Sequence, residues 1–269
     1  MIRLAVRVRR DQAELVLAEL LELAPGGVEE RDDGDLVEYA VYGAPGELPE
    51  LPALRAAAGE ALVEVATTEI ADDWDERWKA FHAPVEVGRL RVRPPWEPPR
   101  EGPIDIVIDP AQAFGTGAHA TTRLCLGLLL GVEPGGALVD VGCGSGVLAI
   151  AAARLGWAPV LGIDHDREAV RATVDNAAAN GVQIEVRRHD LLHDGPAPSA
   201  PTALANLLRP LLLRVAADSF AGPPPDVLIA GGLLAREGDE VAAAFARHGL
   251  HEAERRSEGD WIALLLRGA

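Results

Sequence analysis

The sequence predicts an α/β protein built on a doubly wound, mostly parallel sheet of seven strands, with a small α+β domain in front of it. Three observations predict this fold class. From residue 137 onward short apolar runs alternate with Ala/Leu-rich helical stretches, the first such unit contains a glycine-rich turn, and the first 68 residues follow a different order of elements. Strands separated by helices pair in parallel, and ligands of such sheets bind at the carboxyl ends of the strands.

The segment 1–68 predicts a ferredoxin-like domain. Apolar residues alternate with mostly charged ones over 2–9, as in a half-buried strand. The complete order is strand, helix, strand, strand, helix, strand, which is the ferredoxin-like arrangement. Because this stretch has no candidate nucleophile and no cofactor loop, we interpret it as a recognition domain. The elements expected after the first strand are a helix over 11–23, a hairpin that turns at 32–35, a helix near 52–58 and a strand over 61–66.

A linker helix is predicted over residues 69–83. Trp74 and Trp78 stand four residues apart in it, which places them on one face. We interpret the helix as a stiff connector between two domains. The alternative is that the two Trp side chains are simply part of a core.

The domain over 84–269 contains a glycine-interrupted loop early in its sequence. In this loop Phe114 is apolar, while Gly115 and Gly117 make the backbone pliable. A loop of this kind can close over a ligand and exclude water. Thr122 follows in the first turn of the next helix, where a hydroxyl and backbone amides can meet a carboxylate. The elements expected around the loop are a β-ribbon over 85–93, a strand over 104–108 and a helix over 118–130.

The regular alternation of strands and helices begins at residue 137. Its last two strands have no helix between them, so they predict a hairpin that closes the sheet. The expected strands are 137–140, 160–163, 183–187, 202–205, 226–230, 250–256 and 261–267. The expected helices are one that ends near 155, one over 167–179, one that ends near 220 and one over 234–247.

The stretch ALVDVGCGSGVLAI, residues 137–150, predicts a nucleotide-binding corner. A buried strand ends with Asp140, and the chain then turns into a helix whose N-terminus favours a negative group. The turn contains three glycines, namely Gly142, Gly144 and Gly146. A dinucleotide motif G-x-G-x-x-G would need a glycine where Val147 stands, so the corner is a poor NAD site. The alternative is a glycine turn that binds no ligand.

Polar residues also stand at the ends of the next three strands. Asp164 ends the second strand, where a carboxylate can accept hydrogen bonds from both hydroxyls of a ribose; the alternative is a cap on the following helix. Asp190 follows the third strand and Asn206 the fourth. The side-chain oxygen of Asn206 and a backbone carbonyl can accept hydrogens from an amine and direct its lone pair, whereas the alternative is again a helix cap. Two leucines after Asn206 favour an aliphatic amine over a planar base.

The charge of the chain is strongly negative. The net charge is −17, and residues 1–66 hold 14 acidic against 6 basic residues. Such a field repels nucleic-acid phosphates and attracts a basic partner, although acidity that serves only solubility is the alternative. The chain has two cysteines, Cys125 and Cys143, so we expect no disulfide framework. We also expect neither a membrane span nor a secretory signal, because the sequence lacks the long apolar run that each would need. A reducing cytoplasm is therefore expected.

These motifs together resemble the PrmA family, the bacterial methyltransferases of large-subunit ribosomal protein eleven. The resemblance covers about residues 70–269, and the first domain matches in size and expected topology only. The motifs that carry it are FGTGAHATT at 114–122, the glycine motif at 140–146, Asp164, ANLL at 205–208, Gly232-Leu233-Leu234, Trp261 and the Trp74/Trp78 pair.

The resemblance implies a Rossmann-like methyltransferase sheet with S-adenosylmethionine as cofactor. It implies methylation of lysine side chains and of the N-terminal α-amine of that basic ribosomal protein, which the first domain would bind. Neither nucleic acid nor membrane is an expected partner, and a monomer is favoured. The implied site has Asn206 as the catalytic residue. Its cofactor contacts are Thr122, Gly142, Gly144, Asp140, Asp164, Asp190 and Asn206, with Phe114, Gly115 and Thr116 in the loop over the cofactor.

Neither a general base nor a metal site is predicted. His119 is the nearest titratable candidate, and we interpret it as a structural residue of the loop. His189 and His193 stand beside Asp190, but they do not predict a metal site. Two alternatives remain open: a methyltransferase that acts on another protein, a small amine or a nucleic acid, and a module that binds S-adenosylmethionine without catalysis.

Overall fold

The computed structural model describes residues 2–24, 28–43, 48–49, 51–69, 82–110, 119–218 and 220–268. The chain divides into two compact units, Met1–Phe81 and His82–Ala269, and each is described by itself. The expected linker helix with its two Trp residues lies outside the described residues. The same is true of the loop residues Phe114, Gly115 and Thr116.

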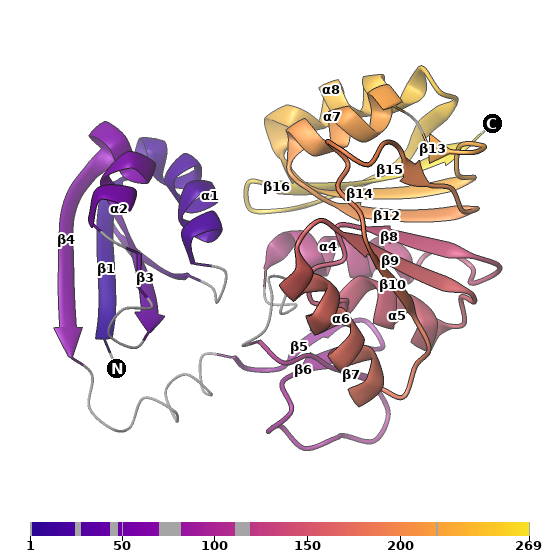
Figure 1. Ribbon diagram of the computed structural model, residues 1–269, viewed down its shortest axis with the longest axis horizontal. Helices are drawn as coiled ribbons and strands as arrows, with labels where there is room; N and C mark the ends of the chain where they lie inside the picture. Colours follow the sequence, from indigo (N-terminus) through magenta and orange to yellow (C-terminus); the bar gives the residue numbers. More distant parts are fainter. Residues whose placement is uncertain are drawn as a thin grey trace. The chain divides into compact units, whose positions relative to one another are not determined.

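The first unit contains a four-stranded antiparallel sheet with strand order β2-β3-β1-β4 (Figure 1). One helix follows β1 and a second helix follows β3 along the chain. The elements are β1 (Ile2–Arg9), α1 (Ala13–Leu23), β2 (Glu29–Asp33), β3 (Leu36–Gly43), α2 (Leu51–Ala58) and β4 (Leu62–Glu69). Helix α1 begins two residues later than expected, because a short 3₁₀ helix occupies Arg10–Gln12.

The two helices of the first unit pack against one face of its sheet. Alternate residues of β1 point toward them, so that Val6 is completely buried. Tyr39 from β3, Leu20 from α1 and Leu54 from α2 complete this core. The hydroxyl of Tyr39 donates to the carbonyl of Ala13 at 3.0 Å, which satisfies the polar atom of an otherwise apolar cluster.

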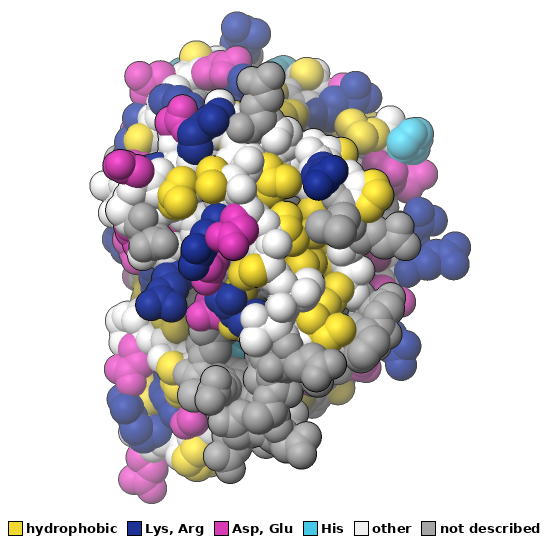
Figure 2. Space-filling model, turned by 90° about the vertical axis from the view of Figure 1, so that its left-hand side faces the viewer, with side chains coloured by type: hydrophobic (Ala, Val, Ile, Leu, Met, Phe, Trp, Pro, Cys, Tyr) yellow, Lys and Arg dark blue, Asp and Glu magenta, His cyan; other side chains and the backbone are white. Residues whose placement is uncertain are grey.

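The opposite face of the same sheet carries paired charges. Glu38 on β3 lies between two arginines of β1, with its oxygens 2.7 Å from Arg3 Nη2 and 2.8 Å from Arg7 Nε. Arg7 also contacts Glu64 on β4 at 3.1 Å. Acidic and basic side chains are interspersed over the face of the molecule shown in Figure 2. Part of the acidic excess of this unit is therefore neutralised locally.

The second unit is built on a seven-stranded sheet with strand order β10-β9-β8-β12-β14-β16-β15. The first five strands in this order are parallel, and β16 and β15 form the antiparallel hairpin that was expected at the end of the chain. The outer strand β15 carries mostly exposed, charged side chains. The strands are β8 (Leu138–Val141), β9 (Val160–Asp164), β10 (Glu185–Arg188), β12 (Thr202–Asn206), β14 (Val227–Leu234), β15 (Leu250–Glu258) and β16 (Trp261–Gly268).

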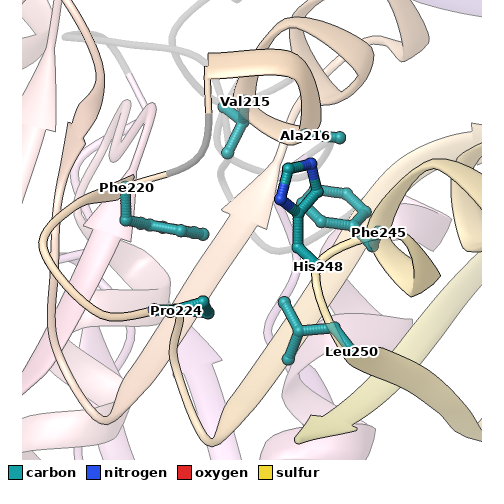
Figure 3. Close-up of a pocket in the computed structure, with 7 residues that line it drawn as sticks. All are labelled: Val215, Ala216, Phe220, Pro224, Phe245, His248 and Leu250. Carbon is teal, nitrogen blue, oxygen red and sulfur yellow. The ribbon is translucent and has the colours of Figure 1, made fainter.

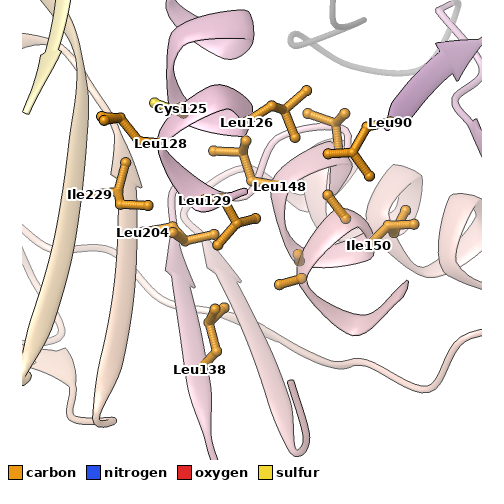
Figure 4. Close-up of a cluster of buried hydrophobic side chains, with 14 of the residues drawn as sticks. Leu90, Cys125, Leu126, Leu128, Leu129, Leu138, Leu148, Ile150, Leu204 and Ile229 are labelled. Carbon is orange, nitrogen blue, oxygen red and sulfur yellow. The ribbon is translucent and has the colours of Figure 1, made fainter. Parts of the chain in front are cut away.

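Helices cover both faces of this sheet, as a doubly wound sheet requires (Figure 1). One face packs against α4, α5 and α6, where side chains such as Leu126, Leu138 and Ile150 form a fully buried core (Figure 4). The other face packs against α7 and α8 through a second core that contains Leu212 and Phe245. The helices are α4 (Ala120–Leu129), α5 (Val147–Leu155), α6 (Arg167–Ala179), α7 (Arg209–Asp218) and α8 (Gly238–Ala246).

The structure adds features that the sequence did not predict. Strand β7 (Ile104–Val107) pairs in parallel with β6 (Leu90–Arg93), next to β5 (Val85–Val87), and so belongs to a small separate sheet. Strand β14 extends four residues beyond the expected end, because the chain pairs with β16 again after an irregularity. Helix α8 consequently begins four residues later than expected. Among the described residues, none of the helices combines the length and the apolar character that a membrane crossing needs.

Candidate functional site

Three of the predicted site residues stand at the ends of three adjacent strands. Asp140 belongs to β8, while Asp164 ends β9 on one side of it and Asn206 ends β12 on the other. The register pairs Asp140 with Gly162 and with Leu204, so Asp164 and Asn206 both extend two residues beyond it. After β8 the chain adds β9 and β10 on one side of β8, and it then crosses to add β12 on the other side. The three residues therefore flank a topological switch point, where ligands of such sheets bind.

The glycine turn after β8 is fixed by the end of the neighbouring strand. The N–H groups of Gly142 and Cys143 both donate to the carbonyl of Ile163, at 2.8 and 3.0 Å. Gly142, Gly144 and Gly146 all have positive φ, between 55° and 81°, which residues with a side chain adopt with strain. The turn ends at Gly146, where α5 begins, and so places the N-terminus of that helix beside the switch point.

Asp164 lies close against this turn. Its Oδ2 accepts the N–H of Gly144 at 3.0 Å, and its Oδ1 accepts the N–H of Asp166 at 3.0 Å. The side chain is largely buried, yet each carboxylate oxygen keeps a lone pair beyond the bond that it accepts. These lone pairs suit the two hydroxyls of a ribose. The sequence left open that Asp164 caps the next helix. The cap of this helix is instead Asp166, whose Oδ1 accepts the N–H of Glu168 at 3.0 Å.

Asp140 is completely buried at the centre of the site. Its Oδ2 accepts the N–H of Ala149 in α5 at 3.0 Å, and its Oδ1 has no hydrogen-bond partner among the described residues. Burial raises the pKa of this carboxyl to about 7; the hydrogen bond from Ala149 opposes the rise and the nearby charge of Asp164 adds to it. Asp140 thus links helix α5 to β8 by a hydrogen bond, while its Oδ1 can still accept a hydrogen bond or bind a proton.

Asn206 and Thr122 lie together on the other side of the switch point. Asn206 Nδ2 lies 3.5 Å from Thr122 Oγ1, the long end of the hydrogen-bond range. The amide oxygen of Asn206 is buried and has no partner among the described residues. A buried polar oxygen without a partner is costly in a protein that binds nothing there. This oxygen is therefore a candidate acceptor for a hydrogen of a bound amine.

Helix α6 supports the turn from behind through residues that sequence reasoning missed. Thr173 donates from Oγ1 to the carbonyl of Gly144 at 2.9 Å, and Asn176 donates from Nδ2 to the carbonyl of Ser145 at 2.9 Å. One turn further on, Asn180 Oδ1 accepts the N–H of Val107 at 2.8 Å, and Asn180 Nδ2 donates to the carbonyl of Val107 at 2.7 Å. The signal in the sequence is two asparagines spaced four residues apart among buried alanines, which places both on the inner face of the helix.

Two further predicted residues make contacts within their own loops. Asp190 accepts the N–H of Leu192 at 2.8 Å, and its Oδ2 lies 2.8 Å from His193 Nδ1. His119 is the N-cap of α4, because its Nδ1 accepts the N–H of Thr121 at 3.4 Å.

His119 has the surroundings of a structural residue, as expected. Its ring packs edge to face on Trp261 with 4.9 Å between centroids. Burial lowers the pKa of His119, and the charge of Arg123 lowers it further. The lowered pKa favours the neutral ring, whose Nδ1 can accept the hydrogen bond of a cap.

An apolar pocket lies near the amino end of β14, at the end of the sheet opposite to the predicted site. It is enclosed by the C-terminal ends of α7 and α8 and by the chain that enters β14, and it contains none of the predicted site residues (Figure 3). Its lining consists of Val215, Ala216, Phe220, Pro224, Phe245, His248 and Leu250. The pocket lies near the amino end of β14, whereas ligands of such sheets bind at the carboxyl ends of the strands.

The residues at the switch point fit S-adenosylmethionine. Asp164 offers acceptors for the ribose of the nucleoside, and the unpartnered oxygens of Asp140 and Asn206 offer acceptors for its polar groups or for an acceptor amine. In the part of the chain that the structure describes, His, Cys, Asp and Glu side chains form no group of three that could bind a metal.

Comparisons with known proteins agree with this fit. The model of the family "Ribosomal protein L11 methyltransferase (PrmA)" matches residues 49–268. A ribosomal protein L11 methyltransferase of Pelotomaculum thermopropionicum is 36% identical over 303 residues, covering 99% of this chain and 98% of that protein. One of Chloroflexus aurantiacus is 39% identical and covers 77% of this chain and 72% of that protein. The crystal structure of a ribosomal protein L11 methylase from Lactobacillus delbrueckii subsp. bulgaricus aligns with a TM-score of 0.61 at 29% identity, covering 69% of this chain and 99% of that one. The chain therefore belongs to the ribosomal protein L11 methyltransferase family, which confirms the resemblance seen in its motifs, the methyltransferase function and S-adenosylmethionine as the cofactor.

Proposed function

We propose that this protein methylates amino groups of ribosomal protein L11, namely lysine side chains and the N-terminal α-amine. The observation that carries the proposal is the buried, unpartnered amide oxygen of Asn206 across the switch point from Asp164. A nucleoside whose ribose is bound at Asp164 would have the glycine turn beside it and Asn206 at the strand end on the other side of β8. The names of the relatives support L11 as the substrate.

The roles of the site residues follow from their positions. Asp164 accepts hydrogen bonds from the ribose, Gly142 and Gly144 allow the nucleoside to approach the backbone, and Asp140 fixes the helix N-terminus beside it. Thr122 orients Asn206. The roles carried over from the family motifs are a cofactor contact at Asp190 and a covering loop that contains Phe114, Gly115 and Thr116.

The reaction needs a neutral amine in a defined orientation. When bound, S-adenosylmethionine supplies a methyl group on a sulfonium, whose sulfur keeps the bonding electron pair as the methyl passes to nitrogen. Asn206 accepts a hydrogen of the amine and so directs its lone pair. The lysine must lose a proton before transfer, and that proton passes to water. Catalysis thus depends mainly on positioning.

The first unit is proposed to be the substrate-recognition domain. We assign residues 1–68 to a ferredoxin-like domain, 69–83 to a linker helix and 84–269 to the methyltransferase domain. The antiparallel order β2-β3-β1-β4 with both helices on one face supports the ferredoxin-like assignment. The net charge of this unit is negative, which favours a basic protein over nucleic acid as the partner. A ribosomal substrate places the protein in the cytoplasm, and a monomer suffices for the proposed site.

The proposal is tested by intact-mass measurement of purified L11 after incubation with the protein and S-adenosylmethionine. Additions in steps of about 14 Da, mapped to lysines and to the N-terminus, are expected. Unmodified L11 together with methylated RNA or small amines would instead support another methyltransferase. Cofactor binding with no product at all would indicate a module without catalysis.

The role of Asn206 is tested with the variant Asn206→Ala. We expect turnover to fall at least about 100-fold, because the side chain acts on the amine. The Kd for S-adenosylhomocysteine, the cofactor without its methyl group, should change about threefold or less. Undiminished turnover in this variant would remove the assigned role. Val174→Ala serves as the control, since this side chain is exposed on helix α6.

A further inference from the structure

Strand β14 contains one residue more than its partner β16 at one place. The register shifts between Ala230 and Leu233, so Gly231 and Gly232 lie opposite a single residue of β16. This arrangement is a β-bulge, which redirects a strand and the groups beside it. Gly232 has φ of +78°, a left-handed conformation that glycine adopts without strain.

The bulge lies directly against the residue that follows Asn206. The N–H of Leu207 donates to the carbonyl of Gly231 at 3.2 Å. A Cβ on Gly232 would stand 2.4 Å from the carbonyl oxygen of Leu207 and 2.8 Å from its carbonyl carbon. Both are backbone atoms, so no change of side-chain rotamer could relieve the contact. Either the bulge of β14 or the backbone that follows Asn206 would have to move, and both changes alter how the two segments fit together.

Leu207 also contacts the cofactor side of the site. A Cβ on Gly142 would stand 2.3 Å from Leu207 Cδ2, so the Leu207 side chain lies against the glycine turn. The segment Asn206–Leu207 is thus enclosed between the bulge of β14 and the turn after β8. Its position depends on the bulge, because the turn contacts only a side chain that can rotate.

We propose that Gly232 is a positioning residue for methyl transfer. Its lack of a side chain lets β14 approach the backbone of Leu207, and this approach sets the place of the Asn206 amide. The inference rests on the function proposed above for Asn206. Gly232 itself touches neither cofactor nor amine, so its replacement acts on the orientation of the amine more than on cofactor affinity.

The experiment compares Gly232→Ala with Gly249→Ala. Gly249 has nearly the same φ, +80°, but no atom lies within 4 Å of the place that its Cβ would take. Both variants therefore add the same backbone strain, and only the first adds a collision. With L11 as acceptor, we expect kcat of Gly232→Ala to fall about 100-fold, with KM for L11 and Kd for S-adenosylhomocysteine changed about threefold or less. Gly249→Ala should retain kcat within about twofold.

Equal kcat values in the two alanine variants would overturn the inference. A second pair, Gly232→Asn and Gly249→Asn, uses the side chain that tolerates positive φ best. If neither Gly232 variant folds while both Gly249 variants do, Gly232 serves only the folding of the sheet, and the inference is likewise overturned. Asn206→Ala is measured in parallel. Full activity of Asn206→Ala contradicts the role proposed above for Asn206. An inactive Asn206→Ala together with normal turnover in Gly232→Ala contradicts only the role of Gly232.

Discussion

The backbone N–H of Asp109 donates a hydrogen bond to Asn176 Oδ1 at 3.1 Å, while the amide nitrogen of the same side chain donates to the carbonyl of Ser145. One buried side chain on α6 thus joins the glycine turn to the segment that precedes residues 111–118. These residues include the loop that the family motifs place over the cofactor.

Replacing Asn176 by Ala should therefore weaken cofactor binding. Two backbone groups lose their partner, so we expect the free energy of unfolding to fall by about 2 kcal/mol and the Kd for S-adenosylhomocysteine to rise about tenfold. Calorimetric titration and urea unfolding measure the two effects. Val174→Ala is the control, because this side chain is exposed on the same helix. Lower stability with unchanged Kd would show that Asn176 supports only the fold.

Asp164→Asn should reduce cofactor affinity, and it also removes an acceptor of one backbone N–H at the glycine turn or at Asp166. The amide keeps one acceptor oxygen but replaces the other by a donor, so it can no longer accept from two ribose hydroxyls and from Gly144. We expect the Kd for S-adenosylhomocysteine to rise about 10- to 100-fold, the loss of one or two hydrogen bonds to a charged group. Asp175→Asn, an exposed change on α6, controls for the lost negative charge. Equal affinities in the two variants would exclude a ribose contact at Asp164.

Asp140 should make stability depend on pH between about 4 and 7. Burial raises its pKa to about 7, so the folded state retains a proton that the unfolded chain has already lost. The stabilisation by this proton is complete below the unfolded pKa and is lost as the pH rises through 7. Its magnitude is on the order of 4 kcal/mol, from a difference of about three pKa units. Asp140→Asn should flatten this part of the stability profile measured by urea unfolding, and an unchanged profile would refute the assignment.

Glu38 should give the first unit the opposite pH dependence. The hydrogen bond from Arg3 lowers the pKa of this carboxyl, and the bond from Arg7 acts in the same direction. Its contribution is therefore present above the unfolded pKa of about 4.5 and is lost as the pH falls through the folded value. Glu38→Gln should reduce the protection of β1 and β3 amides by about 2 kcal/mol at pH 7 in hydrogen exchange. Glu64→Gln, at a more exposed site, should have a smaller effect, and equal effects would contradict the distinction.

The sequence predicted the large sheet and the polar residues at its edge for a simple physical reason. Asp140, Asp164 and Asn206 each follow an apolar run, and parallel strands bring their carboxyl ends to the same edge. The closing hairpin was predictable because no helical stretch separates the last two strands. Helix and strand ends were less predictable, since pairing with a distant strand, as in β14, decides where an element stops.

The supporting residues could not be predicted in the same way. Asn176 and Asp109 are 67 residues apart, and only the folded arrangement of α6 and the strand before Asp109 brings them together. Gly232 resembles many other glycines in the sequence, because its role depends on the backbone of Leu207, which follows the neighbouring strand β12. Local patterns find groups that face a ligand, whereas groups that fix those residues in place depend on tertiary contacts.

The outer strand β15 has a consequence for how the molecule behaves at high concentration. Its guanidinium groups pair with nearby acids, as Arg255 does with Glu252 and Asp239 at 2.8 Å, and Arg256 does with Glu254 at 2.6 Å. An incoming strand would have to displace or bury these charges in order to extend the sheet. The last strand of the sheet thus opposes edge-to-edge aggregation, which leaves its exposed backbone groups to water.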